Sequence, residues 1–308
     1  MSHVYIGIDG GGTKTTVLAV DESGSILGKS VGECTNYHSV GEEITGKILQ
    51  QLIETVSNKF YPQTEISACF GLSGLNTERD RKIYGGLIEK SLTAFPHADF
   101  TLINDVRLVI AAGTAKDWGI AVIAGTGSHV YGIDKNAMEY HCGGFDWLVS
   151  DEGSAFEMGI KIIRAVLWER DGRGPKTYLS SLLFNHLKCT STQELIDWVY
   201  GSAFTKVRFA NLSLLIDDAL NSNDAVAMRI ITETQTNLGN MVAAIVRDDA
   251  WQKEPFEIVL SGGVFKIGQR LTEPLTETLK AVAPIATVKV LDKEPVWGAV
   301  RLAREKHV

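Results

Sequence analysis

The stretch Val4-Tyr5-Ile6-Gly7-Ile8-Asp9-Gly10-Gly11-Gly12-Thr13-Lys14-Thr15-Thr16-Val17-Leu18-Ala19-Val20 joins an apolar strand through a glycine-rich turn to a second run of β-compatible residues. A dinucleotide fingerprint would need Gly at Thr15 and a P-loop would need Gly at Thr13, so neither standard phosphate motif fits. An acidic turn closes the second run, and a third short run follows. We therefore predict a β-meander with no helix after the loop.

Three successive glycines leave the backbone N–H groups of this turn unshielded and free to adopt positive φ. Such a turn can form a nest of amides for phosphate. Asp9, at the end of the first strand, would then be placed to hold Mg²⁺ directly or through water. A plain glycine-rich hairpin with an acidic turn explains the same residues, and this stretch alone leaves both interpretations open.

The composition favours a two-domain protein with a small-molecule partner. The chain has 308 residues, of which 44% are hydrophobic, and a net charge of −7. No Lys/Arg run is interleaved with aromatic residues, so nucleic acid is not expected as a partner. The four cysteines lack C-x-x-C spacing, which disfavours zinc and disulfides. No leader opens the sequence and no apolar run approaches the roughly 20 residues of a membrane span, so we expect a cytoplasmic protein with no membrane association.

The segments after the meander predict an α/β domain. Apolar spacing predicts helices over 42–60 and 77–95 around a buried strand at 65–74. A further strand, 100–103, runs into Asn104-Asp105 before a helix. Asp105 thus follows the carboxyl end of a strand, where open α/β sheets bind their ligands, although an N-cap role would explain an Asp there equally well.

Residues 118–134 repeat the opening pattern of strand, glycine loop, strand and acidic turn, with the loop at Gly125-Thr126-Gly127. The chain therefore looks duplicated. Two such halves would turn their glycine hairpins toward each other across a cleft, where a nucleoside triphosphate has enough phosphate to be held from both sides.

The second half departs from the first after this point. A helix is expected over 155–168, and short helical segments between 178 and 221 predict a helical insertion. A long helix over 225–247 precedes a strand that ends in a third glycine turn, Gly262-Gly263, which is expected to open a helix. The remaining expected elements are a strand at 286–291 and a helix at 297–305.

With these segments in place, the chain resembles the N-acetylglucosamine kinases, within the broader group of sugar kinases and activator ATPases that share the fold of actin and the large heat-shock chaperones. Three segments match that group's phosphate and adenosine motifs in order and separation: Asp9-Gly-Gly-Gly-Thr13-Lys14, Ala124-Gly-Thr126-Gly-Ser128 and Leu260-Ser261-Gly262-Gly263. Three more resemble the kinases' amino-sugar segments: Thr35-Asn36, Cys142-Gly143-Gly144-Phe145 and Asp151-Glu152-Gly153-Ser154.

The resemblance implies a site that uses ATP and Mg²⁺. Asp105 would be the catalytic base and would contact the sugar, and Asp9 would lie on the metal side. The other implied sugar contacts are Asn36, Gly144, Phe145 and Asp151. The implied nucleotide contacts are Gly11, Gly12, Thr13, Lys14, Gly125, Thr126, Gly127, Ala210, Gly262 and Gly263. The chain departs from the family pattern at Phe145, Asp146 and Ser150, where Trp, Gly and Gly are common, which bears on the identity of the sugar more than on the reaction.

The implied fold consists of two actin-like (ribonuclease H-like) α/β domains with a nucleotide cleft between them. The smaller domain would comprise residues 1–113 with the terminal helix, 296–308, packed back on it. The larger would comprise residues 114–295 with the helical insertion. A homodimer is also expected.

Several candidate residues have plainer explanations. Asp151 and Glu152 could form the acidic first turn of the helix that follows, although we assign Asp151 to the sugar. His141 beside Cys142 suggests a thiolate–imidazole pair, but neighbours on a strand point to opposite faces, so we interpret both as structural. Of the aromatic residues near the site only Phe145 is assigned to it, because aromatics in such proteins are more often core.

The expected function is ATP-dependent phosphorylation of the 6-hydroxyl of N-acetylglucosamine or a close relative. Glucosamine and N-acetylmuramic acid are alternative substrates. An activator ATPase would need closely spaced cysteine ligands for an iron–sulfur cluster, and this chain lacks them. A non-catalytic sugar sensor would lack the base and would normally carry an added DNA-binding segment.

Overall fold

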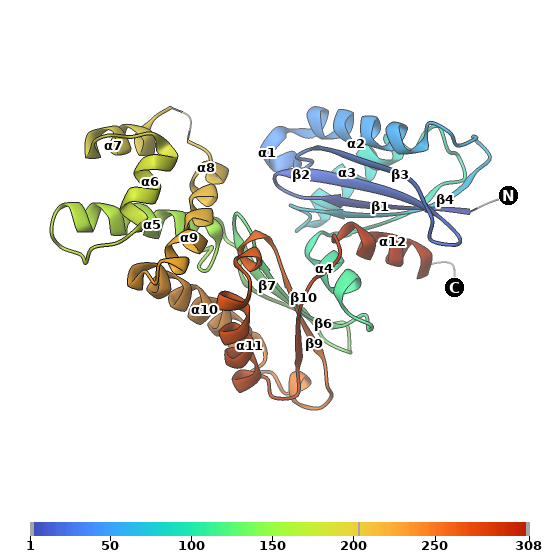
Figure 1. The fold of residues 1–308 in the computed structure, drawn as a ribbon. Helices are drawn as coiled ribbons and strands as arrows, with labels where there is room; N and C mark the ends of the chain where they lie inside the picture. Colours follow the sequence, from blue (N-terminus) through green and yellow to red (C-terminus); the bar gives the residue numbers. More distant parts are fainter. Residues whose placement is uncertain (1–2, 203, 306–308) are drawn as a thin grey trace. The chain divides into compact units, whose positions relative to one another are not determined.

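The computed structural model describes residues 3–202 and 204–305, and these form two compact units (Figure 1). One unit contains the chain up to Asp117 together with the segment from Leu291 onward, and the other is Trp118–Val290. The divisions expected from the sequence lie a few residues from these points. That the two units are separate folding domains remains a prediction.

The first unit is built on a five-stranded sheet in the order β3-β2-β1-β4-β5. Its strands are β1 (His3–Gly10), β2 (Lys14–Asp21), β3 (Ile26–Glu33), β4 (Glu65–Leu72) and β5 (Asp99–Asn104). The first three strands pair antiparallel, and β4 and β5 run parallel to β1. This confirms the predicted meander, in which no helix follows the first glycine turn.

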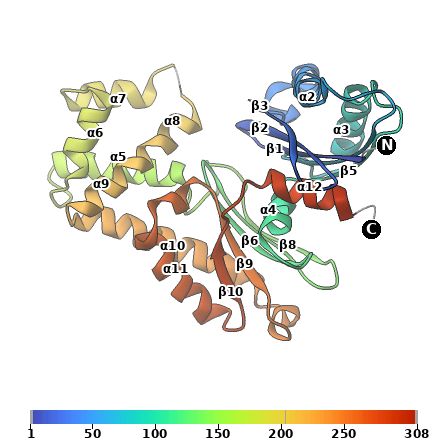
Figure 2. The ribbon, with the colours of Figure 1, turned by 45° about the vertical axis from the view of Figure 1, so that its right-hand side comes forward.

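Helices cover both faces of this sheet (Figures 1 and 2). Its helices are α1 (Tyr37–Val40), α2 (Glu42–Ser57), α3 (Glu78–Ser91), α4 (Val106–Gly113) and α12 (Val296–Glu305). Ile6 and Ile8 face the core under α2 and α3, whereas Leu18 on β2 faces α12. Gly7 allows this packing, because a Cβ there would lie 2.7 Å from the Val296 carbonyl oxygen. Helices α2 and α3 each end a few residues before the end predicted from apolar spacing.

The second unit repeats the sheet, in the order β10-β9-β6-β7-β8. Its strands are β6 (Gly119–Ala124), β7 (Ser128–Ile133), β8 (Glu139–Gly143), β9 (Glu257–Ser261) and β10 (Thr287–Val290). Again three strands form an antiparallel meander and two follow in parallel. The predicted duplication is therefore confirmed at the level of topology. The shared topology, with helices on the sheets, is that of the actin-like, ribonuclease H-like fold.

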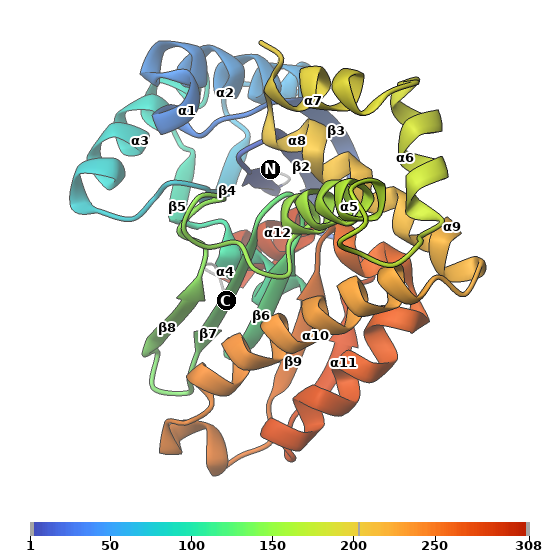
Figure 3. The same cartoon turned by 90° about the vertical axis from the view of Figure 1, so that its left-hand side faces the viewer.

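The helices of the second unit pack on its sheet and build the insertion. Helices α10 (Ala225–Ile245) and α11 (Gln269–Val282) run side by side against the strands (Figure 3). The other elements are α5 (Ala155–Arg170), α6 (Leu179–Leu187), α7 (Thr192–Tyr200), α8 (Lys206–Ala210), α9 (Leu215–Asn221) and the 3₁₀ turns η1 (Asn211–Leu214), η2 (Asp249–Gln252) and η3 (Gly263–Ile267). The helix expected directly after the third glycine turn is corrected: η3 comes first, and Gly268, at φ +85°, separates it from α11.

Candidate active site

The first glycine turn joins β1 to β2. Its backbone is closed by a hydrogen bond of 3.0 Å from the Gly11 amide to the Lys14 carbonyl. A Cβ at Gly12 would meet nothing within 4 Å, and both Thr13 and Lys14 are exposed. The turn is therefore open to a ligand at Gly12, whereas the Gly11 amide is used within the turn. The structure brings Gly11, Gly12, Thr13 and Lys14 together there.

Two carboxyl groups with raised pKa values lie in the same unit. Asp9 belongs to β1, and burial raises its pKa to about 6, with Lys14 opposing the shift. Asp105 directly follows β5, and burial together with the charge of Asp9 raises its pKa to about 7. A carboxyl group that titrates near neutral pH can take up a proton and release it.

Asp105 does not cap the helix that it precedes. Its side chain makes no capping hydrogen bond to the first turn of α4. Asn104, the residue before it, accepts a hydrogen bond of 3.2 Å from the Val106 amide through its Oδ1. The capping explanation considered for Asp105 is therefore not supported by its side-chain hydrogen bonds.

Asn36 begins the short helix α1 and acts as its N-cap. Its Oδ1 accepts a hydrogen bond of 3.0 Å from the His38 amide, and this contact sets the orientation of the side-chain amide because a cap must be an acceptor. The Nδ2 group is then the main group left for a ligand. We conclude that Asn36 presents a donor, which is well suited to a hydroxyl or carbonyl oxygen.

The loop that carries Asn36 is tied to the first hairpin. The Thr35 hydroxyl lies 2.8 Å from the Thr15 hydroxyl on β2, and a Cβ at Gly10 would lie 2.4 Å from the Thr35 hydroxyl. The buried Tyr84 hydroxyl lies 3.0 Å from the Thr35 carbonyl and 2.8 Å from the Ser73 carbonyl. Asn36 is thus held close to the first glycine turn.

The second glycine turn joins β6 to β7 and is held by α5. The Gly125 amide donates to the Gly127 carbonyl at 2.8 Å, and the Gly125 carbonyl accepts from the Ala155 amide at 2.8 Å. The Thr126 carbonyl accepts from the Phe156 amide at 3.4 Å. The first turn of α5 therefore fixes the backbone of this loop.

The third glycine turn packs directly on the second. Gly262 has φ +123°, and a Cβ there would lie 2.2 Å from the Ala124 carbonyl oxygen. Only glycine combines that backbone conformation with so close an approach. A Cβ at Gly263, in contrast, would meet nothing within 4 Å. The structure thus brings the predicted second phosphate motif and the adenosine motif together at one end of β6 and β9.

The predicted sugar residues of the second unit follow β8. Gly144 has φ +79°, and a Cβ there would lie 3.0 Å from the His129 ring. Phe145 is 73% exposed, so it is not part of the core. Trp147 instead packs against the rings of Phe156 and Phe204. The assignment of Phe145 to the site stays a prediction.

Asp151 is a buried carboxylate beside the second glycine turn. Its Oδ1 accepts a hydrogen bond of 3.2 Å from the Ser128 amide, and a Cβ at Gly127 would lie 2.9 Å from its oxygens. The suggestion that residues 151 and 152 form the first turn of α5 is wrong. Ser154 caps that helix, and its hydroxyl accepts from the Glu157 amide at 3.1 Å.

Lys206, which sequence patterns did not single out, contacts this carboxylate. Its Nζ lies 3.3 Å from Asp151 Oδ2 and also pairs with Asp146. Burial alone would lower the pKa of Lys206, but the hydrogen bond to Asp146 and the charges of both aspartates outweigh it and raise that pKa. The pair is separated by 55 residues, and neither spacing nor composition pointed to it.

Two other predicted features have clear positions. Ala210, at the end of α8, is 6% exposed and packs in the core of the second unit. Burial raises the pKa of the Cys142 thiol, which argues against a thiolate there. The structural interpretation of Cys142 is thus supported.

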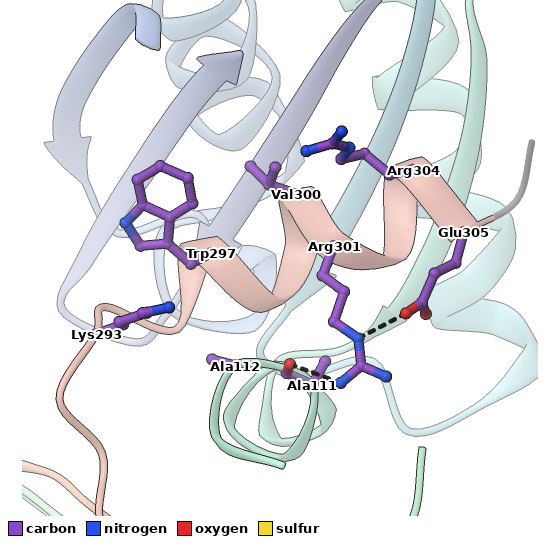
Figure 4. Close-up of a pocket in the computed structure, with 8 residues that line it drawn as sticks. All are labelled: Ala111, Ala112, Lys293, Trp297, Val300, Arg301, Arg304 and Glu305. Atoms are coloured by element: carbon purple, nitrogen blue, oxygen red, sulfur yellow. Dashed lines mark hydrogen bonds and ion pairs between the residues drawn. The ribbon is translucent and has the colours of Figure 1, made fainter. Parts of the chain in front are cut away.

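A cavity of about 380 Å³ lies in the first unit between α4 and α12, and none of the candidate site residues lines it (Figure 4). Arg301 lines it and donates to the Ala111 and Thr114 carbonyls at 3.2 and 2.7 Å and to Glu305 at 2.6 Å. Its guanidinium is therefore engaged in joining the two helices. We therefore interpret this cavity as part of the packing between α4 and α12.

Two further observations concern metal and membrane. Within residues 3–202 and 204–305, no group of three or more His, Cys, Asp or Glu side chains is arranged to hold a metal ion. Over the same part of the chain, every helix is too short or too polar to cross a bilayer.

The fold and these clusters define a two-unit ATPase of the actin-like class. Residues 6–303 match the BadF/BadG/BcrA/BcrD ATPase family, and the chain belongs to that family. Membership implies that the protein uses ATP. The family resemblance inferred from the motifs is thereby confirmed.

Named relatives and a solved structure resemble the chain along its length. It is 29% identical to an N-acetyl-D-glucosamine kinase of Dictyostelium discoideum and 32% identical to an N-acetylmuramic acid/N-acetylglucosamine kinase of Clostridium acetobutylicum, covering 98% of each chain in both cases. A crystal structure of a Chromobacterium violaceum protein assigned as an N-acetylglucosamine kinase superposes with a TM-score of 0.76 at 20% identity, covering 98% of this chain and 99% of that one.

Proposed function

We propose that the protein transfers the γ-phosphoryl group of ATP to the 6-hydroxyl of N-acetylglucosamine or a closely related amino sugar. The observation that carries the proposal is Asp105, a carboxyl group with a pKa of about 7 that directly follows the carboxyl end of β5. It lies in the same unit as the first glycine turn and the anchored Asn36. Full-length similarity to two amino-sugar kinases supports the choice of acceptor.

The proposed reaction assigns the proton to Asp105. The sugar oxygen attacks the γ-phosphorus while the bond from that phosphorus to the β–γ bridging oxygen breaks. The hydroxyl proton passes to the Asp105 carboxylate, and ADP leaves with the electron pair of the broken bond. Asp105 then returns its proton to solvent.

The residues present fit a magnesium ion bound with the nucleotide. Mg²⁺ is usually held by one or two carboxylates, water and substrate phosphates rather than by an all-protein cage. Asp9 is a half-buried carboxyl whose raised pKa indicates that its charge is poorly compensated. We propose that Asp9 holds the ion, directly or through water. The ion would neutralise charge on the phosphates.

For the nucleotide, we propose that both phosphate turns bind one triphosphate. Gly11–Lys14 would contribute from the first unit and Gly125–Gly127 from the second. Gly262 and Gly263 would lie against the adenosine. The backbone near Ala210 would contribute as well.

For the sugar, we propose contacts from both units. Asn36 would donate to an oxygen of the sugar, and Asp151 would accept from its hydroxyls. Gly144 would let the backbone approach, and Phe145 would provide an apolar surface. We also propose that the protein is a homodimer and that it is cytoplasmic.

The alternative substrates are glucosamine and N-acetylmuramic acid, and the Clostridium relative carries both N-acetylated sugars in its name. An activator ATPase and a sugar sensor remain as other functions. Cys34 and Cys69 are buried, which does not favour a cluster shared at a surface.

The deciding experiment is a coupled assay of ADP release over four sugars: N-acetylglucosamine, N-acetylmuramic acid, glucosamine and glucose. We expect kcat/KM to be highest for N-acetylglucosamine and lowest for glucose, because unpaired polar groups in a site built for the acetamido group penalise the analogue that lacks it. Equal values for glucose and N-acetylglucosamine would refute the sugar contacts. The absence of ADP release with every sugar would refute the kinase itself.

A further inference from the structure

Lys206 stands at the start of α8 and joins the helical insertion to the proposed sugar segments. Its Nζ is 3.3 Å from Asp151 and also pairs with Asp146. All three residues belong to the unit Trp118–Val290. From this arrangement we infer that Lys206 is a positioning and specificity-determining residue that favours neutral over cationic amino sugars; the inference rests on the function proposed above.

The exposed fractions of the three side chains show which of the two ion pairs is the more buried. The Asp151 side chain is 5% exposed, whereas Lys206 is 31% and Asp146 is 64% exposed. A buried carboxylate is costly unless hydrogen bonds and an opposite charge compensate it. The Ser128 amide supplies one hydrogen bond and Lys206 supplies the charge. Lys206 thereby compensates the charge of the buried carboxylate and holds it in one orientation.

The more exposed ion pair, between Lys206 and Asp146, contributes less to the free energy. Asp146 has φ +78°, a conformation that suits glycine better than aspartate. Its ion pair with Lys206 is partly in water, where such pairs are worth little. At the buried carboxylate, therefore, the positive charge of Lys206 mainly compensates the negative charge of Asp151.

This balance selects among amino sugars. The ammonium of glucosamine would have to share the carboxylates with Lys206, and like charges in a poorly solvated site repel each other strongly. A hydroxyl or an acetamido N–H meets no such repulsion and can still donate to a free lone pair of Asp151. Without Lys206, Asp146 or Asp151 would suit the ammonium of glucosamine, and the positive charge of Lys206 removes that advantage.

The test compares Lys206→Met, Lys206→Gln and Lys206→Arg with the wild-type protein. Isothermal calorimetry would measure binding of N-acetylglucosamine and of glucosamine, in buffer acidic enough to keep the amine protonated. We expect the Met variant to bind N-acetylglucosamine about tenfold more weakly and to lose about tenfold of its discrimination against glucosamine, which corresponds to about 1.4 kcal/mol. The Arg variant should retain the discrimination. KM for ATP should stay within about twofold in all three, because Lys206 pairs with Asp146 and Asp151 rather than with a residue of the three glycine turns.

Two matched controls separate this role from general stability. Lys135→Met makes the same change at a surface ion pair with Glu254 in the same unit and should leave sugar discrimination unchanged. Asp146→Gly removes the exposed partner at a position where glycine is unstrained, and it should also leave N-acetylglucosamine binding within about twofold. Lys206→Gln keeps a polar contact to Asp151, so it should lose discrimination even if the Met variant folds poorly.

The outcomes distinguish this inference from the proposed function. Unchanged discrimination in the Gln variant, or an equal loss in Lys135→Met, would overturn the role of Lys206. A wild-type protein that binds N-acetylglucosamine but releases no ADP would refute the kinase while the binding data still decide on Lys206. A wild-type protein that binds neither sugar would overturn the inference about Lys206.

Discussion

At the scale of the residue, the protonation of Asp105 is the central property. Burial and the nearby charge of Asp9 raise its pKa to about 7. A base is most effective when its pKa lies close to the working pH, since it is then both largely ionised and able to hold a proton. Asp105 meets that condition without a histidine.

Replacing Asp105 with Asn should lower kcat by about 10²–10⁴, the usual contribution of a positioned general base. Sugar and nucleotide binding should persist, because the shape of the side chain is kept. Steady-state kinetics with calorimetric binding checks this. Turnover close to that of the wild-type protein would remove Asp105 from its assigned role.

Asp105→Asn should also raise the free energy of unfolding, and the sign of this change follows from the raised pKa of Asp105. The pKa of Asp105 in the folded protein, about 7, lies above the ordinary range of an aspartate carboxyl, so ionising Asp105 opposes folding. This penalty is absent below about pH 4, grows as the pH rises and is complete above about pH 7. Urea unfolding near pH 8 should show Asp105→Asn more stable by about 1–4 kcal/mol. A gain that is equally large near pH 4 would point to another cause.

Activity should fall with acidity for the same reason. Below about pH 7, kcat/KM for the sugar should drop roughly tenfold per pH unit as Asp105 takes up a proton. Asp9→Asn should lower the pKa of Asp105, because the charge of Asp9 is one cause of its rise. Carboxyl ¹³C NMR titration of the ligand-free variant and wild-type proteins would measure this. Identical titrations of Asp105 would contradict the coupling.

At the scale of the element, the strand ends determine where the glycine turns lie. β6 and β9 are parallel neighbours, so the turns that follow them emerge at the same edge of the sheet. Gly262 lets the third glycine turn approach the Ala124 carbonyl, and the first turn of α5 holds the second glycine turn by its carbonyl groups. The predicted phosphate and adenosine motifs are adjacent because of this strand pairing.

Gly262→Ala should therefore be costly. The added Cβ would meet the Ala124 carbonyl oxygen at 2.2 Å, at a backbone conformation that alanine rarely adopts. We expect a loss of about 2–4 kcal/mol in unfolding free energy and a raised KM for ATP. Gly263→Ala is the matched control, because its Cβ would meet nothing within 4 Å. Similar losses in the two variants would show that the close approach is not the cause.

At the scale of the whole molecule, one topology occurs twice. Each unit has an antiparallel meander followed by two parallel strands, and each places a glycine turn after its first strand. In the first unit this turn lies beside Asp9, and in the second it lies beside Asp151. The same arrangement of strand, glycine turn and strand therefore occurs in both units, and different residues surround the turn in each.

If both turns bind one triphosphate, ligands should draw the two units together. A non-hydrolysable ATP analogue with Mg²⁺ and sugar should reduce the radius of gyration measured by small-angle scattering. AMP with the same sugar is the control, because it lacks the β- and γ-phosphates that both turns would share. Compaction with AMP equal to that with the analogue would contradict the proposal that both turns bind one triphosphate.

The sequence by itself determined the local elements and their order. Period-two apolar runs, glycine turns and helical spacing report the geometry of neighbouring residues, so they predicted both meanders and the strand-end position of Asp105. The ends of α2 and α3 and the 3₁₀ turn η3 were less well predicted. Gly268, at φ +85°, separates η3 from α11, and composition does not reveal such a φ value.

Only the tertiary structure decided which distant groups meet and how they ionise. Lys206 contacts Asp151 across 55 residues, and no local pattern relates a lysine in a helical insertion to a carboxylate after a strand. The donor presented by Asn36 depends on the cap it makes to α1, and the raised pKa of Asp105 depends on burial. Burial and contact between segments arise from packing, whereas periodicity records only the shape of each segment.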